Sequence, residues 1–131
     1  MADLDTVKVL AKARSWGFCE GCGLSGQRLD VHHRQARGMG GVSGPAAVIA
    51  NDIRNVLALC RTCHAETEHA ETWDLTQSLG WRIPHWVDDP WIVPALIYTV
   101  QGRAWWELTK EAGYRFCGLS LDHRITWARP C

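Results

Sequence analysis

The sequence predicts an α+β fold: a helix, a strand, a long loop, a second strand, a second helix and a β-hairpin extension. Two short segments, 28–33 and 55–59, have the residue composition and the alternation of β-strands. The Gly-rich stretch 38–45 between them is incompatible with regular structure and must be a loop. One C-x-x-C pair precedes this unit and another follows it. The pattern therefore predicts a small unit held together by its cysteines.

The chain has 131 residues, enough for one ordinary domain or a small domain with an appendage. We expect a domain over 1–80 and a Trp-rich β extension over 81–131 that packs on it. No stretch is long and apolar enough to span a bilayer, and the N-terminus lacks the features of a secretory signal. We therefore expect an intracellular protein that is not bound to a membrane. Thiols stay reduced in that compartment and more often hold metal than form disulfides.

Charged residues and tryptophans are unevenly distributed. Residues 1–64 carry eight Lys/Arg against five Asp/Glu, whereas residues 65–131 carry six against nine. A basic half could face a polyanion, but a split of this size is a weak signal. Seven of the eight Trp follow residue 72. We expect them to pack a small C-terminal core rather than to form a base-stacking surface.

The N-terminal elements follow from apolar spacing and turn residues. Residues 5–16 predict a helix with Asp3 or Asp5 at its N-cap. The next segment, 18–23, predicts a tight turn whose two glycines let the backbone fold around a bound ion. The segment 46–53, after the Gly-rich loop, fits neither helix nor strand clearly.

The C-terminal half predicts one helix and then extended structure. A helix should run from Arg61 to Leu79, with Gly80 in a left-handed conformation just after its end. Three prolines exclude a long helix beyond that point. Segments 91–100 and 103–109 predict two strands joined at Gln101-Gly102. A last extended piece is expected over 124–127.

Two C-x-x-C pairs predict a structural metal site. Each turn brings two thiolates within reach of one ion, and two such turns complete a tetrahedral sulfur site that suits zinc. The expected ligands are Cys19, Cys22, Cys60 and Cys63. The 37 residues between the pairs exceed the spacer of a compact zinc ribbon, so they must hold an inserted unit. The remaining Cys117 and Cys131 are expected to be packing or surface thiols.

The sequence Cys60-Arg61-Thr62-Cys63-His64 also matches C-x-x-C-H, the attachment site of c-type haem. Haem attachment would leave the first cysteine pair and the paired histidines unexplained. It also normally requires an exported protein. A structural zinc site accounts for more of the pattern.

Histidines around the cysteines predict a second metal site. His32 and His33 point to opposite faces of a strand, so one can bind a metal while the other acts as a base. His64 opens the following helix, and Glu68 lies one turn further on the same face, whereas His69 is rotated away. We expect His32, His64 and Glu68 to converge on one divalent cation. Such a set leaves coordination positions open, as a catalytic metal requires.

The combination of paired histidines, Asn55 and the run N-V-L-A-L-C-R-T-C-H resembles the HNH endonucleases, the ββα-metal or His-Me finger nucleases. The resemblance covers about residues 17–70 and includes the flanking cysteine pairs and the Gly-rich loop. The phrase His-His-Arg-x-x-Arg-Gly-Met-Gly-Gly is most similar to HNH proteins of bacteriophages. The resemblance implies a small ββα-metal core stapled by a four-cysteine zinc site.

The resemblance also implies a role for each matching residue. His33 would be the general base, and Asn55 would tie the long loop to the site and orient His33. His32 and His64 would bind the catalytic cation. The family usually has a third histidine where this chain has Glu68, and a carboxylate favours a harder cation such as Mg²⁺ or Mn²⁺.

The implied activity is metal-dependent hydrolysis of DNA phosphodiester bonds. It would leave a 5′-phosphate and a 3′-hydroxyl. Asp30 is expected beside the site, and His85 and His123 are expected to have no role in it. Four arginines are candidate phosphate contacts: Arg34, Arg37, Arg54 and Arg61.

Several properties stay open at this level. A monomer would most simply nick DNA, whereas a dimer could cut both strands. The phage-like loop favours a phage-encoded protein in the host cytoplasm. By the same analogy, the phage packaging terminase is a candidate partner. The alternative function is a zinc-ribbon module that binds DNA without cutting it. His33 distinguishes the two, because a binding module would not need it.

Overall fold

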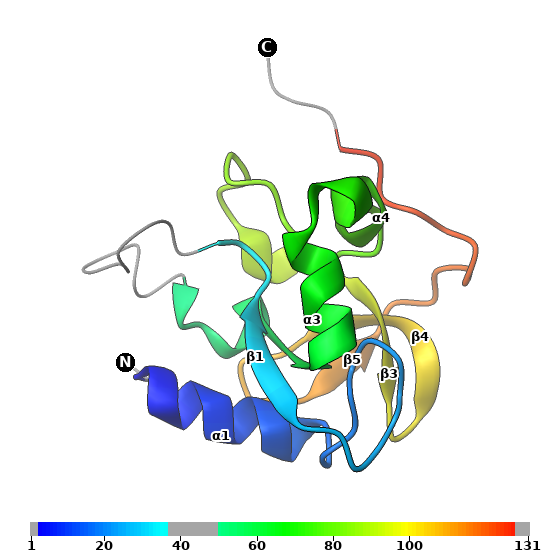
Figure 1. The fold of residues 1–131 in the computed structure, drawn as a ribbon. Helices are drawn as coiled ribbons and strands as arrows, with labels where there is room; N and C mark the ends of the chain where they lie inside the picture. Colours follow the sequence, from blue (N-terminus) through cyan, green and yellow to red (C-terminus); the bar gives the residue numbers. More distant parts are fainter. Residues whose placement is uncertain (1–2, 37–49, 128–131) are drawn as a thin grey trace.

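A computed structural model describes residues 3–36 and 50–127 (Figure 1). Within these ranges the α-helices are α1 (Leu4–Arg14), α3 (Arg61–Glu68) and α4 (Trp73–Ser78). The strands are β1 (Leu29–His33), β2 (Val56–Cys60), β3 (Ala95–Thr99), β4 (Gly102–Leu108) and β5 (Tyr114–Phe116). Short 3₁₀ turns are η1 (Ile53–Asn55), η2 (Ala70–Thr72) and η3 (Pro90–Ile92). The α+β class is confirmed. None of these helices is long and apolar enough to cross a membrane.

The first sheet is an antiparallel pair of β1 and β2, and α3 follows β2 without a break. Leu29 pairs with Cys60 and His33 pairs with Val56. Every residue of β2 is buried. Figure 1 shows α1 and α3 on either side of β1, so the paired histidines lie on a strand held from two sides. The predicted Gly-rich loop 38–45 lies outside the described residues.

Helix α1 begins one residue earlier and ends two residues earlier than the predicted helix 5–16. The Asp3 carboxylate accepts a hydrogen bond of 2.8 Å from the Thr6 amide, so Asp3 is the N-cap. The helix stops at Arg14 because the chain turns left-handed at Trp16 (φ 56°) and Gly17 (φ 77°). Its buried face contributes to a small cluster formed by Val7, Ala11, Ile53 and Val56.

The predicted helix 61–79 is wrong at one point, His69. There the backbone is extended (φ −83°, ψ 130°), so α3 and α4 are separate helices. Carbonyls near the end of α3 are bound by side chains from outside it. The Arg82 guanidinium donates to Thr67 O at 2.9 Å, and the Thr72 hydroxyl donates to Glu66 O. These acceptors therefore do not need amides from a continuing helix.

The predicted end at Gly80 is confirmed. Gly80 has φ +75°, and a Cβ there would lie 2.1 Å from Pro94 O. Only glycine fits this close approach between the end of α4 and the chain before β3.

The second sheet has the order β3-β4-β5 with antiparallel neighbours. The hairpin around Gln101-Gly102 is confirmed, because Thr99 pairs with Gly102. The first predicted strand began too early: Pro90–Ile92 forms η3, and β3 starts only after Pro94, which has no amide to donate. The sequence reading missed β5. It also placed extended structure at 124–127, where no strand forms.

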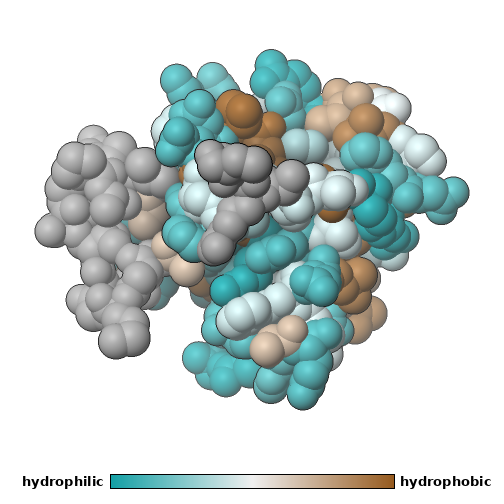
Figure 2. All heavy atoms as spheres, turned by 90° about the horizontal axis from the view of Figure 1, so that it is seen from above, coloured by the Kyte–Doolittle hydropathy of each residue, from teal (hydrophilic) through white to brown (hydrophobic). Residues whose placement is uncertain are grey.

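One hydrophobic cluster joins the two halves of the chain. It includes Leu57 and Leu59 from β2 together with Leu96, Ile97 and Trp105 from the second sheet. Trp81, Trp105 and Trp106 are buried, so the expected tryptophan core is present in part. On the face seen from above, hydrophobic residues lie in separate patches among hydrophilic ones (Figure 2).

A buried ion pair connects α1 with the first cysteine turn. The Arg14 guanidinium donates to both Glu20 carboxylate oxygens, at 3.0 and 2.8 Å, and neither side chain is exposed. Arg14 also donates to the carbonyls of Ile53 and Val56 at 3.0 and 2.9 Å. This guanidinium therefore satisfies one carbonyl of η1 and one at the start of β2 as well as its counter-ion.

Glu20 extends the same network to the second sheet. Its carboxylate accepts from the Ala58 amide at 2.7 Å and from the Tyr114 hydroxyl at 2.5 Å. Its backbone amide donates to Ala58 O, and its carbonyl accepts from the Tyr98 amide, both at 2.8 Å. One residue thus bonds β2, β3 and β5 and the helix α1.

Replacing Glu20 with Gln tests this network, because it removes the negative charge and keeps the size of the side chain. The uncompensated charge of Arg14 should lower the free energy of unfolding by about 3–5 kcal/mol, measured by urea denaturation. The matched control is Glu107→Gln, whose partner Arg115 lies 2.7 Å away with 72% of its side chain exposed. We expect a cost below about 1 kcal/mol there. Equal costs at the two sites would contradict a supporting role for Glu20.

Candidate metal centres

The four cysteines of the two C-x-x-C pairs come together. Cys19 and Cys22 lie in the turn after α1, Cys60 ends β2, and Cys63 lies in the first turn of α3. Their sulfur atoms all lie within 4.8 Å of one another. The group is buried except for partly exposed Cys22. These four side chains could bind one metal ion, as the spacing predicts.

Backbone amides donate hydrogen bonds to one sulfur of the cysteine cluster. The amides of Gly21 and Cys60 donate to the Cys19 sulfur at 3.3 and 3.1 Å. A hydrogen bond from Cys63 and these amides hold the pKa of the Cys19 thiol well below its usual range, against the opposing effect of burial. A Cβ at Gly21 would lie 3.0 Å from the Cys63 sulfur. Glycine at this position therefore lets the turn pack closely against Cys63, without a Cβ in the way, as expected.

A second cluster joins His32 of β1 with His64 and Glu68 of α3. One ligand atom from each lies within 4.8 Å of the others, and the two imidazole centroids are 5.3 Å apart. Antiparallel pairing of β1 with β2 and the immediate start of α3 bring these residues together. The cluster has the composition of a divalent-cation site, with two imidazoles and one carboxylate.

Hydrogen bonds leave a lone pair on one ring nitrogen of His32. Its Nε2 lies 2.8 Å from the carbonyl of Trp81, which can only accept, so Nε2 carries the proton. Thr67 Oγ1 lies 3.4 Å from Nδ1, but its hydroxyl donates to the His64 carbonyl at 2.6 Å. Burial lowers the pKa of His32 to about 3, so the ring is neutral near pH 7. Nδ1 is therefore the available ligand atom.

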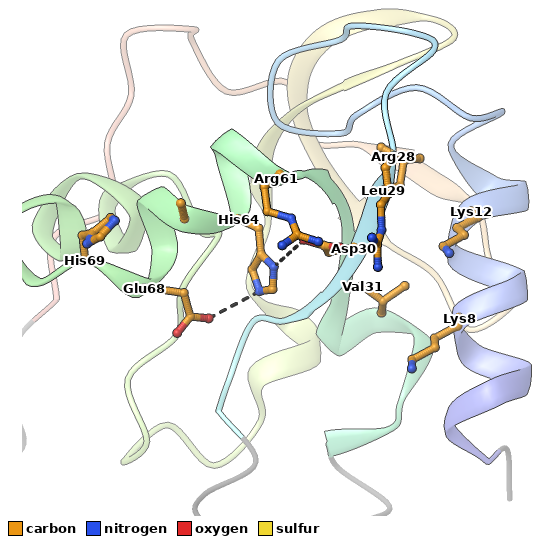
Figure 3. A pocket seen from close by; sticks show the side chains of 11 residues that line it. Lys8, Lys12, Arg28, Leu29, Asp30, Val31, Arg61, His64, Glu68 and His69 are labelled. Carbon is orange, nitrogen blue, oxygen red and sulfur yellow. Dashed lines mark hydrogen bonds and ion pairs between the residues drawn. The ribbon is translucent and has the colours of Figure 1, made fainter.

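Asp30 orients the His64 ring, as the Trp81 carbonyl orients the His32 ring. Its carboxylate accepts a hydrogen bond of 3.1 Å from Nδ1 of His64, while Nε2 lies 3.3 Å from a Glu68 oxygen (Figure 3). Partial burial opposes ionisation of Asp30, but His64 and Arg61 lower the pKa of its carboxyl. A carboxylate behind a histidine is a common way to fix a metal ligand. The sequence predicted Asp30 beside the site without identifying its partner.

Asn55 forms hydrogen bonds with residues on both sides of the segment 37–49. It is fully buried. Its side chain accepts from the Gln35 amide at 2.9 Å and donates to the carbonyls of Gln35 and Ala50, both at 3.2 Å. Its own carbonyl accepts from the Arg34 amide at 2.6 Å. Asn55 therefore fixes the chain directly after His33, where the resemblance implied a loop-tying residue.

His33 lies on the opposite face of β1 from His32 and is partly exposed. Its Nε2 lies 3.4 Å from Asn51 Oδ1. His33 lines the same hollow as His32, His64 and Glu68. His33 and the candidate cation site thus open to one space.

The assignment of Arg34 as a DNA contact is wrong. Its side chain is fully buried, and its guanidinium donates to the backbone carbonyls of Gly80, Arg54, Val93 and Pro94. A phosphate on the surface cannot reach it. Arg34 instead holds the chain between α4 and β3 against η1, a role that an arginine next to two histidines did not suggest.

The other predicted arginines differ in their availability. Arg61 has 70% of its side chain exposed, and its Nε lies 3.5 Å from Asp30. Arg54 is paired with Asp52 at 2.7 Å, and its guanidinium lies 5.1 Å from the centroid of the Trp91 ring. Much of its capacity to bind a phosphate is therefore used within the protein. Arg37 lies outside the described residues.

Two hollows meet at the histidine cluster, because His64 and Glu68 line both. The first, which we call the basic groove, has a volume of about 580 Å³. Its cationic side chains are Lys8, Lys12, Arg28 and Arg61. Figure 3 shows Lys8 and Lys12 on α1 facing β1 across this groove. The sequence reading missed these lysines, although their i, i+4 spacing places them on one helical face.

In comparisons with family models, curated proteins and solved structures, no significant match was found. The function therefore has to be inferred from the geometry of the two candidate metal sites and the hollows around them.

Proposed function

We propose that this chain is a metal-dependent endonuclease of the HNH type that hydrolyses DNA phosphodiester bonds. One observation carries the proposal: His32, His64 and Glu68 converge, with the protonated nitrogens of both imidazoles turned toward other partners. His32 donates to the Trp81 carbonyl, and His64 donates to Asp30. An arrangement that leaves two lone pairs and a carboxylate facing one point favours a divalent cation over ordinary packing.

The cysteine cluster is proposed to hold a structural zinc ion. Four sulfur donors within 4.8 Å of one another fit a tetrahedral ion that accepts thiolates. The ion would join the turn after α1 to the junction of β2 and α3. Metal binding of this kind contributes roughly 10–16 kcal/mol, which is comparable to the whole stability of a small domain.

The histidine cluster is proposed to hold a harder cation, Mg²⁺ or Mn²⁺, because Glu68 adds a carboxylate. When bound, that ion supplies positive charge to the phosphate oxygens and the leaving 3′-oxygen. His33 accepts the proton of the attacking water at its unprotonated nitrogen, since an ordinary histidine titrates at about pH 6.5. Asn55 holds the backbone that carries His33. Arg61 is exposed beside Asp30 and is placed to bind a phosphate.

Metal content tests the zinc assignment. Protein purified without added metal should contain about one zinc ion per chain by plasma mass spectrometry. Replacing Cys63 with Ser should lower that content severalfold and lower the melting temperature. Cys117→Ser is the matched control, because this cysteine is outside the cluster. Unchanged zinc in the Cys63 variant would contradict the assignment.

Cleavage of supercoiled plasmid tests the nuclease assignment. With Mg²⁺ or Mn²⁺ the protein should convert the plasmid to open-circle or linear DNA, and EDTA should stop the conversion. His33→Ala should slow it by about 10²- to 10⁴-fold, since this is the usual contribution of a general base. His123→Gln is the control, because this histidine is exposed and lines neither hollow.

Two outcomes would redirect the proposal. A His33→Ala variant that cuts at the normal rate would show that the base is another residue. Failure of the wild-type protein to cut with any metal, at full zinc content, would favour a DNA-binding module without nuclease activity.

A further inference from the structure

Three tryptophans stand apart from the hydrophobic core and line the second hollow. Trp81, Trp105 and Trp106 are at most 6% exposed. In contrast, Trp73 is 39% exposed, and Trp86 and Trp127 are partly buried. Trp73, Trp86 and Trp127 line a hollow of about 960 Å³, which we call the Trp pocket. Its size is at the upper end of the range for ligand pockets, about 300–1,000 Å³.

Two rings of the Trp pocket, Trp86 and Trp127, contact each other. Trp86 and Trp127 meet edge to face, with centroids 5.9 Å apart and ring planes at 80°. Such a contact covers a face of only one of the two rings. Trp127 is fixed by a hydrogen bond of 2.8 Å from its indole nitrogen to the Gln77 carbonyl. Trp86 and Trp127 therefore form a joined aromatic surface in the wall of the pocket.

A cationic side chain, Arg82, also lines the Trp pocket. The Arg82 guanidinium lies 4.2 Å from the centroid of the Trp73 ring, and it donates to the Thr67 carbonyl at 2.9 Å. Arg82 is thus anchored at the end of α3, to the residue that directly precedes Glu68 of the histidine cluster. A guanidinium stacked on an indole can extend a stacking surface and also bind a phosphate.

The two hollows that meet at His64 and Glu68 differ in chemistry. Among its described lining residues the basic groove has Lys and Arg but no Trp, Tyr or Phe. The Trp pocket has three indoles and one accessible arginine, Arg82. Lysines and arginines suit the phosphates of paired or unpaired DNA. Indole faces can stack only on bases whose own faces are exposed, which requires an unpaired strand.

We propose that the Trp pocket binds unpaired nucleobases next to the scissile phosphate, and that the preferred substrate is DNA with a single-stranded segment beside the cut. This inference rests on the proposed nuclease function. The phosphate at the histidine cluster has duplex DNA along the basic groove on one side. On its other side the strand continues without a partner, and its bases stack on Trp86 and Trp73.

Binding of labelled DNA in the His33→Ala background tests this inference, because that variant leaves the substrate uncut. Three DNAs are compared by fluorescence anisotropy: a blunt duplex, the same duplex with a single-stranded overhang, and the overhang DNA with abasic sites in its unpaired part. We expect the overhang to bind about 5- to 100-fold more tightly than the other two.

Substitutions of Trp86 separate stacking from packing. Trp86→Leu should remove most of the preference for the overhang and leave binding of the duplex unchanged, whereas Trp86→Phe should retain much of it. Once Trp86 is Leu, abasic sites should cost little more, because the ring and the base act as a pair. Trp16→Leu is the control, because this ring is 75% exposed and lines neither hollow.

The inference is overturned if overhang and blunt DNA bind equally, or if abasic sites leave the affinity unchanged. The abasic comparison needs no folded Trp86 variant. It also separates the two proposals. Plasmid cutting that depends on His33, without any preference for the overhang, would support the nuclease function and reject base binding in the Trp pocket. A preference for the overhang without any cutting would support base binding and reject the nuclease function.

Discussion

The buried pair of Arg14 and Glu20 is the interaction on which the arrangement of this chain depends. Glu20 lies between two cysteines of the first C-x-x-C turn, so the contacts that satisfy its charge also position the metal ligands. Its carboxylate bonds the Ala58 amide of β2 and the Tyr114 hydroxyl of β5. A bare charge buried here would be costly, which makes the docking of α1 and both sheets interdependent. The cysteine site and the charge network therefore support the same junction.

That junction positions the histidine cluster. The pairing of β1 with β2 brings His32 beside α3, and the cysteine at the end of β2 lies four residues before His64. Hydrogen bonds that the two imidazoles donate to the Trp81 carbonyl and to the Asp30 carboxylate then select the tautomer of each ring. The site therefore depends on the segment after α4 as well as on β1 and α3. This dependence gives the C-terminal half a direct part in the geometry of the site.

Local patterns in the sequence predicted the local structure well. The two strands, the glycine after α4 and the convergence of His32 with His64 and Glu68 follow from spacing and turn chemistry, which also narrowed the N-cap of α1 to Asp3 or Asp5. The break at His69 was not predictable, because it depends on Arg82 and Thr72 reaching carbonyls of α3 across the fold. Arg34 and Glu20 look like surface residues in the sequence, since their acceptors and donors come from distant segments. The division of the tryptophans into core and pocket has the same long-range origin.

We propose two chemically different cation sites in this chain, one of sulfur ligands and one of nitrogen and oxygen ligands. Anomalous diffraction from crystals grown with Mn²⁺, recorded at the zinc and manganese absorption edges, tests this proposal most directly. We expect a zinc peak among the four cysteines and a manganese peak among His32, His64 and Glu68. A manganese peak elsewhere, or zinc bound by the histidines with the cysteines unliganded, would contradict it.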